Sequence, residues 1–191
     1  MEDPPMLQHP AEIERLLNLY VKLNPQRVLE IGSLFGGTLK KWIEFAPVGA
    51  IIVSVDVIPN PDYFPTEDIL HWRSRWPVWA RKARVNLETI YGNSNNNATV
   101  ERVSKFAPFD FIFVDGGHEY ATVANDYAIY SKLLRADGVI AFHDIAYPNR
   151  NDRSVDVGRW WRNIKKTKSA KMEEILRHPD QKDWGIGIIR K

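Results

Sequence analysis

Short, almost uninterrupted apolar runs alternate along the chain with longer segments in which apolar residues recur every three or four positions. Such runs are typical of strands buried on both faces, and such segments are typical of helices with one face on a core. The pattern predicts strands at residues 27–31, 51–56, 85–91, 109–114 and 138–142, and a terminal pair marked by Leu176 and the closing WGIGIIRK. It predicts helices at residues 10–22, 37–45, 99–106, 120–134 and 157–168.

The alternation of apolar strands with helices indicates a parallel sheet that is covered on both faces. Crossover connections in such sheets are right-handed, so we predict a doubly wound α/β sandwich. The length of 191 residues fits a single domain that spans residues 1–191.

One segment interrupts the alternation. Between residues 59 and 84 the chain has four prolines and three tryptophans, and we interpret it as an insertion that covers one edge of the sheet. Its second half, HWRSRWPVWARKAR, interleaves tryptophans with arginines, a composition that could also stack on bases and contact phosphates. We favour the covering role and keep nucleic-acid binding as the alternative.

Composition excludes several classes of protein. The chain has no cysteine, which rules out disulfide scaffolds, thiolate metal sites and cysteine nucleophiles. A formal net charge of +2 does not by itself imply a polyanionic partner. No apolar stretch reaches the roughly 18 residues that span a bilayer, and the acidic, proline-rich start MEDPPMLQHP is unlike a secretory signal. We therefore expect a cytoplasmic protein without a membrane partner, and the oligomeric state stays open, a homo-oligomer included.

Polar residues gather where the predicted strands end, while the strand interiors are nearly free of charge. These residues are Glu30, Asp56, Asp115, His143 and Asp144, with His118 three residues beyond Asp115. Ligands of an open parallel sheet bind outside the carboxyl ends of its strands. We therefore predict that this edge holds the functional site.

The first predicted strand runs into a glycine-rich turn, VLEIGSLFGGT, whose spacing is not the G-x-G-x-x-G of dinucleotide sites. Asp56 lies 19 residues after Gly37, where an acid usually accepts hydrogen bonds from ribose hydroxyls. Glu30 would repel a pyrophosphate at this turn but would attract a cation. S-adenosylmethionine has an ammonium, a sulfonium and a ribose and lacks phosphate, so it suits these residues better than a nicotinamide dinucleotide does.

Longer motifs strengthen this interpretation. The matching stretches are VLEIGSLFGGT, IIVSVD, YGNSNNNATVERV, FDFIFVDGGHEYATVANDY and GVIAFHDI. Through them the chain resembles class I S-adenosylmethionine-dependent methyltransferases, and it is most similar to the small O-methyltransferase-like group that includes cephalosporin-hydroxylase-type proteins and macrolide sugar O-methyltransferases. The resemblance implies a Rossmann-like methyltransferase fold, with a mostly parallel seven-stranded sheet whose last strand is antiparallel.

The resemblance also implies roles for residues. The cofactor would contact Glu30, Gly32, Ser33, Gly36, Gly37, Thr38, Asp56, Val57, Asn93, Ser94, Asp115 and Gly116. In relatives with metal-dependent activity, carboxylates at the ends of the fourth and fifth strands bind a divalent cation. Here those positions are Asp115 and Asp144, with His143 beside them. An imidazole in that set would weaken a preference for Mg²⁺ and admit Mn²⁺, Fe²⁺ or Zn²⁺.

His118 is the candidate catalytic base, together with Asp115 and Asp144. Methyl transfer to a hydroxyl requires that the acceptor lose a proton, which a histidine can take near neutral pH and which a bound cation can also promote. His118 could instead only cap the helix that follows it. We therefore predict an O-methyltransferase of a small hydroxylated metabolite. The alternatives are a nucleic-acid methyltransferase and a relative that binds the cofactor without transferring methyl groups.

Overall fold

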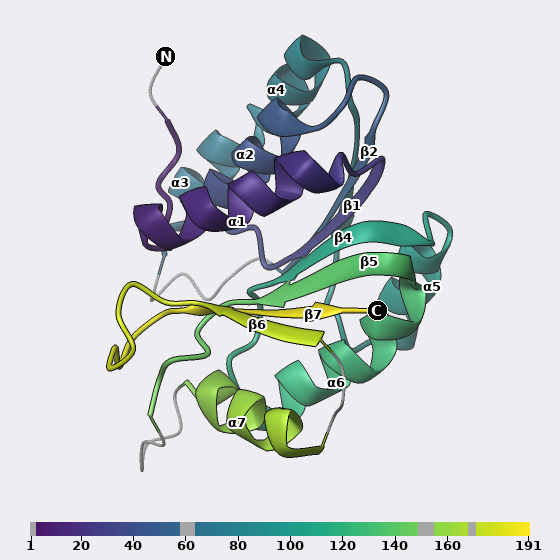
Figure 1. Ribbon diagram of the computed structural model, residues 1–191. Coiled ribbons are helices and arrows are strands. Elements are labelled where there is room, and N and C mark those ends of the chain that lie inside the picture. Colours follow the sequence, from purple (N-terminus) through teal and green to yellow (C-terminus); the bar gives the residue numbers. More distant parts are fainter. Residues whose placement is uncertain (1–2, 58–63, 149–154, 168–170) are drawn as a thin grey trace.

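The computed structural model describes residues 3–57, 64–148, 155–167 and 171–191, and these residues form a seven-stranded sheet with helices on both faces (Figure 1). The strands are β1 (Arg27–Ile31), β2 (Ile51–Asp56), β3 (Asn86–Tyr91), β4 (Phe109–Val114), β5 (Leu134–Phe142), β6 (Lys171–Ile175) and β7 (Ile186–Arg190). The helices are α1 (Pro10–Leu23), α2 (Gly37–Phe45), α3 (Thr66–Arg73), α4 (Trp76–Ala83), α5 (Asn97–Ser104), α6 (Tyr120–Tyr130) and α7 (Val157–Thr167), with a 3₁₀ turn, η1, at Ser131–Leu133.

The strand order in the sheet is β3-β2-β1-β4-β5-β7-β6. β1 pairs in parallel with β2 and β4, β2 with β3, and β4 with β5, whereas β7 runs antiparallel to both β5 and β6. The order reverses between β1 and β4, which is the point at which doubly wound sheets bind their ligands. The predicted fold, mostly parallel with an antiparallel last strand, is confirmed.

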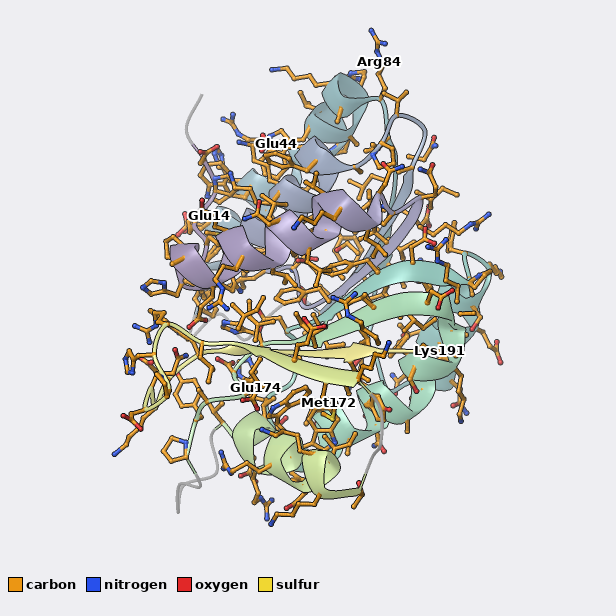
Figure 2. The ribbon with its side chains drawn as sticks, viewed as in Figure 1. Glu14, Glu44, Arg84, Met172, Glu174 and Lys191 are labelled. Atoms are coloured by element: carbon orange, nitrogen blue, oxygen red, sulfur yellow. The ribbon has the colours of Figure 1, made fainter. Side chains whose placement is uncertain are left out.

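Successive residues of the central strands face two separate apolar layers. Val28 of β1 packs in the layer with α1, α2 and α4, whereas Leu29 packs in the layer with α5, α6 and α7. Figure 1 shows these two sets of helices on opposite sides of the sheet. Charged side chains such as Glu14 and Glu44 are exposed on the outer faces of the helices (Figure 2). None of the described helices combines the length and the apolar character that crossing a bilayer requires.

The helix predicted from Tyr120 to Leu134 is shorter than expected. α6 ends at Tyr130, η1 follows, and Leu134 already pairs with Phe109 as the first residue of β5. Leu134 is buried, and its apolar side chain happens to continue the helical spacing although it belongs to a strand. β5 therefore has nine residues, and it begins four positions before the predicted strand.

Smaller differences occur at other boundaries. The predicted terminal pair of strands is present as β6 and β7, although Leu176 follows β6 instead of lying within it. α5 begins at Asn97, two positions ahead of the predicted helix. The predicted end of the last helix, Lys168, lies outside the described residues.

Residues 64–84 of the segment that we interpret as an insertion contain α3 and α4. α4 lies between β2 and β3 in the chain and packs on α2 and β3, so it provides the crossover helix that two parallel neighbours need. Trp76 and Trp79 are buried in the layer with α1 and α2. Their rings are packed inside the protein and do not form a surface on which bases could stack.

We expect Tyr20→Phe to destabilise the protein. The Tyr20 hydroxyl donates a hydrogen bond to the Trp42 carbonyl at 2.8 Å, one of the last carbonyl groups of α2, which have no partner within the helix. Removing the hydroxyl leaves this buried acceptor unsatisfied, which should lower the free energy of unfolding by about 1–2 kcal/mol. Urea denaturation measures the change, and Tyr91→Phe, on a ring that is 52% exposed, is the control. A loss no larger than that of the control would contradict the prediction.

Candidate active site

A cavity of about 660 Å³ lies at the carboxyl ends of the central strands. Most of the site residues predicted from the sequence line it: Gly32, Ser33, Gly37, Thr38, Asp56, Val57, Asn93, Ser94, Asp115, Gly116, His118, His143 and Asp144. Of the predicted set, Glu30 and Gly36 are absent from the described lining. The structure therefore gathers residues from five separate stretches of sequence around one space.

The loop between β1 and α2 needs its glycines because other groups crowd against its backbone. Gly32 has a φ of +86°, and a Cβ on it would lie 2.1 Å from the carbonyl oxygen of Asp115 at the end of β4. Gly36 has a φ of +90°, and a Cβ on it would lie 2.3 Å from the indole nitrogen of Trp76. Only glycine adopts such a conformation with so little space. Gly36 thus serves the contact between the loop and α4, which explains why it does not line the cavity.

Glu30 is fully buried beneath the glycine loop. Its carboxyl group accepts hydrogen bonds from Ser33 Oγ at 2.6 Å, Thr38 Oγ1 at 2.5 Å and Trp42 Nε1 at 2.9 Å. Burial raises the pKa of Glu30 to about 7, although these three donors oppose the rise. Glu30 therefore anchors the loop and the start of α2 from below. Glu30 is absent from the described lining of the cavity, and its contact with a ligand ammonium stays a prediction.

Asp56, the predicted ribose ligand, lines the cavity at the end of β2. Its Oδ2 accepts hydrogen bonds from the backbone N–H groups of Ser33 at 3.1 Å and Leu34 at 2.6 Å, and from Arg73 Nη2 at 2.8 Å. Burial raises the pKa of Asp56, and the guanidinium of Arg73 works against that rise. Arg73 is a site residue that the sequence analysis missed, because the hydrophobic pattern does not place the segment from which it comes.

Two aspartates and two histidines meet at the ends of β4 and β5. His118 Nε2 lies 3.3 Å from Asp144 Oδ2 and 3.8 Å from Asp115 Oδ1, and His143 Nδ1 lies 3.2 Å from an oxygen of each aspartate. Burial works to raise the pKa of Asp115, but the imidazoles, His143 foremost, hold it well below its usual range. Burial works to lower the pKa of both histidines, and the carboxylates nevertheless raise it. Each carboxylate therefore has an imidazole within contact distance.

Three of these side chains could hold a metal ion together. Asp115, His118 and Asp144 each offer a ligand atom, and these atoms lie within 4.8 Å of one another. His118 thus joins the two aspartates in this set. His143 Nδ1 lies 3.2 Å from an oxygen of each aspartate, so its role as a ligand stays a prediction, and its buried Nε2 has no partner among the described residues. Two carboxylate oxygens and one imidazole nitrogen fit Mn²⁺, Fe²⁺ or Zn²⁺ better than Mg²⁺.

The N-terminal segment closes one side of the cavity. Pro5, Leu7 and Gln8 line it, and the side-chain amide of Gln8 donates a hydrogen bond to Asp115. A Cβ on Gly37 would lie 2.6 Å from the carbonyl oxygen of Pro5, so this segment also packs directly on the start of α2. The sequence predicts no function for this segment, because a short proline-rich stretch carries no periodic signal.

Trp184 lines the cavity from the loop between β6 and β7, with a φ of +50° that is unusual for a bulky residue. Glu12 of α1 is 1% exposed and holds this loop. It accepts hydrogen bonds from the Gly185 N–H at 2.9 Å and Gln181 Nε2 at 2.8 Å, and it pairs with Arg177 Nε at 3.2 Å. A buried carboxylate that is absent from the described lining of the cavity therefore fixes the backbone that presents the Trp184 ring.

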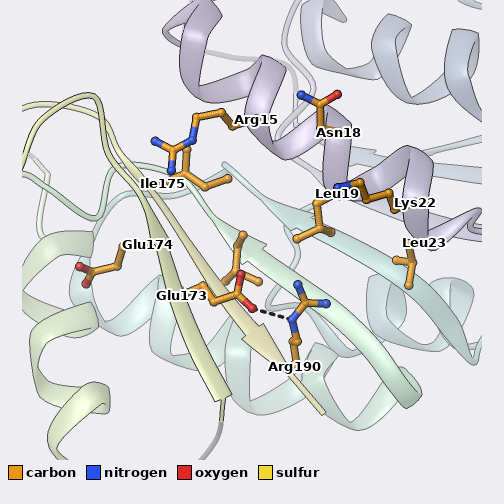
Figure 3. Close-up of a pocket in the computed structure, with 10 residues that line it drawn as sticks. Arg15, Asn18, Leu19, Lys22, Leu23, Glu173, Glu174, Ile175 and Arg190 are labelled. Atoms are coloured by element: carbon orange, nitrogen blue, oxygen red, sulfur yellow. Dashed lines mark hydrogen bonds and ion pairs between the residues drawn. The ribbon is translucent and has the colours of Figure 1, made fainter.

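A second groove, of about 520 Å³, lies between α1 and strands β6 and β7 (Figure 3). Charged side chains of both signs surround it, and Arg190 pairs with Glu173 across its floor at 2.8 Å. None of the predicted site residues belongs to its described lining. The cavity at the strand ends is therefore the candidate active site.

Residues 29–145, more than half of the chain, match the family model of a methyltransferase domain. The chain belongs to this methyltransferase family. No relative emerges from a comparison with curated protein sequences. The matched region runs from β1 to the loop after β5, so it includes the glycine loop, Asp56 and the cluster of aspartates and histidines.

Solved methyltransferase structures share the fold. An O-methyltransferase from Bacillus cereus in complex with SAH is similar over 96% of this chain and 82% of its own, with 18% identity and a TM-score of 0.67. The O-methyltransferase TomG from Streptomyces achromogenes, in complex with SAM, is similar over 97% of this chain and 81% of its own, with 17% identity and a TM-score of 0.70. MycE methyltransferase, in complex with Mg, SAH and mycinamycin VI, is similar over 92% of this chain and 48% of its own, with 19% identity and a TM-score of 0.60.

Glu30 should make the stability of this methyltransferase depend on pH. Its pKa is about 7 in the folded chain against an ordinary value of 4.5, so the folded chain retains the proton and stability is lost as the pH rises from about 4.5 to about 7. Glu30→Gln does not titrate, so the wild type should lose on the order of 3 kcal/mol relative to this variant over that range. Urea denaturation at steps of pH measures the difference. A difference that stays constant with pH would show that Glu30 titrates normally.

We expect Glu12→Ala to release the loop that carries Trp184. The substitution leaves the Gly185 N–H and the Arg177 guanidinium without their shared acceptor, which should lower the free energy of unfolding by about 2–3 kcal/mol. Hydrogen exchange should show lost protection at the Gly185 amide. Glu14→Ala, on the exposed face of the same helix, is the control and should change neither quantity. Unchanged protection at Gly185 would mean that other contacts hold the loop.

Proposed function

We propose that this methyltransferase transfers the methyl group of S-adenosylmethionine to a hydroxyl group of a small metabolite, and that the cluster at the ends of β4 and β5 activates the acceptor. One observation supports it above the others: a glycine loop, an acid at the end of β2 and a cluster of aspartates and histidines line a single cavity. The structures in complex with SAM, SAH or Mg named above give the same expectation, since they share this fold.

The residues of the cavity suit the parts of this cofactor. The methionine portion would lie beside Gly32, Gly37 and Thr38, which line the cavity at the loop, and Asp56 can accept a hydrogen bond from the ribose. Asn93 and Ser94 line the cavity after β3 and would flank the adenine. The described lining of the cavity includes no lysine or arginine to pair with a pyrophosphate.

The cluster of Asp115, His118, His143 and Asp144 would activate the acceptor hydroxyl. The cofactor supplies an electrophilic methyl group on a sulfonium sulfur. The acceptor oxygen forms its bond to that carbon as the carbon–sulfur bond breaks, and the hydroxyl proton must leave. The His118 imidazole can take this proton on Nδ1, because its side chain is 41% exposed and lines the cavity, and the two carboxylates that Nε2 faces stabilise the imidazolium that forms. A divalent cation bound by Asp115, His118 and Asp144 would instead lower the pKa of a coordinated hydroxyl.

The size of the cavity favours a small acceptor. A volume of about 660 Å³ has to hold the cofactor and the acceptor together, and pockets for one drug-sized ligand already span about 300–1,000 Å³. Trp76 and Trp79 are buried, so two of the three tryptophans between residues 59 and 84 cannot stack on the bases of a nucleic-acid substrate. We therefore propose a small molecule and not a nucleic acid as the acceptor.

Calorimetric titration with S-adenosylmethionine and with SAH tests the proposed cofactor. Both should bind at the cavity at the strand ends, and incubation with methyl-labelled cofactor and a panel of phenols, catechols and sugars should then transfer label to a hydroxyl. The absence of binding at millimolar cofactor would overturn the proposal. Binding without transfer to any acceptor would favour a relative that retains only the cofactor site.

The role of His118 can be separated from that of His143 by titrating the protein with Mn²⁺. If Asp115, His118 and Asp144 form the metal site, His118→Gln should weaken Mn²⁺ binding by at least about tenfold, whereas His143→Gln should have a smaller effect. His178→Gln, on an exposed loop, is the control. If the wild type does not bind Mn²⁺, His118 acts as a base alone. An equal loss of Mn²⁺ affinity in His118→Gln and His143→Gln would mean that His143 is a metal ligand as well.

A further inference from the structure

Arg73 is a buried charge at the site that the proposed function does not use. It is the last residue of α3, and its side chain is 3% exposed. Its guanidinium carbon lies 5.4 Å from the ring centroid of Trp76 and 5.5 Å from that of Tyr91. Burying a guanidinium is costly unless its partners compensate for lost water, so the groups that it contacts indicate its role.

Its hydrogen bonds fall on three residues of the cavity lining. Nη2 donates to Asp56 Oδ2 at 2.8 Å and to the Val57 carbonyl at 3.1 Å, and Nε donates to the Leu34 carbonyl at 3.1 Å. The Leu34 N–H in turn donates to the same Asp56 oxygen at 2.6 Å. Arg73 thus closes a ring of hydrogen bonds that fixes the glycine loop and the Asp56 carboxylate relative to each other.

The acceptor sites of Asp56 can be counted. A carboxylate offers about four lone-pair sites, two on each oxygen. Oδ2 already has three donors, from Ser33, Leu34 and Arg73, and Oδ1 accepts the Val57 N–H at 2.7 Å. The three donors share the two sites of Oδ2, so among the contacts of the described residues one site remains, on Oδ1. Asp56 can therefore accept one further hydrogen bond without giving up an existing one.

We propose that Arg73 is a positioning residue that commits Oδ2 of Asp56 to the protein and leaves Oδ1 to accept a hydrogen bond from a single ribose hydroxyl. This inference rests on the proposed function, because it takes Asp56 as the ribose ligand. A carboxylate with both oxygens free could instead accept hydrogen bonds from both ribose hydroxyls. The site should therefore discriminate strongly against the loss of one ribose hydroxyl and tolerate the loss of the other.

The wild-type protein tests the first half of the proposal. Calorimetric titration compares SAH with its 2′-deoxy and 3′-deoxy analogues. One analogue should bind about tenfold or more weakly than SAH, and the other within about twofold. Equal losses for the two analogues would overturn the proposal, because Asp56 would then read both hydroxyls. Failure of SAH itself to bind would instead overturn the proposed function, and the two failures are distinguishable.

Variants test the part played by Arg73. Arg73→Met should weaken SAH about tenfold but leave the affinity for the discriminated analogue nearly unchanged, so that the ratio between them falls toward one. Arg73→Lys keeps the charge without the planar fork and should restore part of the ratio. Arg81→Met, on an exposed arginine of α4, is the matched control and should leave the ratio at the wild-type value.

A merely structural role for Arg73 predicts a different result. Arg73→Met would then weaken SAH and both analogues by one common factor, and the ratio would not move. That result would overturn the proposal. Thermal denaturation of each variant reports whether the fold persists. If Arg73→Met does not fold, the wild-type comparison together with Arg73→Lys still decides, because an unchanged ratio in the lysine variant would equally contradict a positioning role.

Discussion

Two buried carboxyl groups hold the glycine loop, and the rest of the site takes its position from that loop. Glu30 binds the side chains of Ser33 and Thr38 from below, and Asp56 binds the backbone N–H groups of Ser33 and Leu34 from the side. Both acids sit at strand ends, so their carbon atoms are fixed by the sheet. The two carboxyl groups thus hold backbone and side-chain donors of this loop, and the cavity lies beside it.

The cluster at the ends of β4 and β5 follows a different principle, which is charge balance. Asp115 and Asp144 lie close enough together that two uncompensated carboxylates would repel each other. His118 and His143 compensate them from either side. The same four side chains can therefore accommodate protons or a cation, and this flexibility suits a site whose task is to take a proton from an acceptor.

Sequence alone predicts the sheet and the edge at which the site lies, because apolar strands and the acids that end them are local signals. Asp56 and Asp115 are found in this way. The predicted end of the helix at Leu134 is wrong, because a single apolar residue is compatible with both a helical and a strand spacing. Its pairing with β4 assigns it to a strand. The direction of Glu30 also escapes prediction, because a residue near a strand end can face the ligand or the layer beneath it. In the folded chain, the hydrogen bond from Trp42 Nε1 shows that Glu30 faces α2.

Contacts across long sequence separations carry no such signal. Arg73 reaches Asp56 from a segment without periodicity, and Glu12 reaches the loop before β7 from the other end of the chain. Trp184 enters the cavity only because that loop is held in place. These residues surround the predicted site and position it, and they become visible only when the chain is folded.

The path of the N-terminal segment has a practical consequence. Lys40 pairs with Asp3, and Gln8 contacts Asp115, so the chain from Asp3 to His9 runs along the mouth of the cavity. A purification tag joined to the N-terminal side of this segment would lie near the entrance of the cavity and obstruct substrates. β7 runs antiparallel to β5, so Arg190 emerges at the opposite edge of the sheet. Enzymology on this protein should therefore place any fusion partner after the final strand.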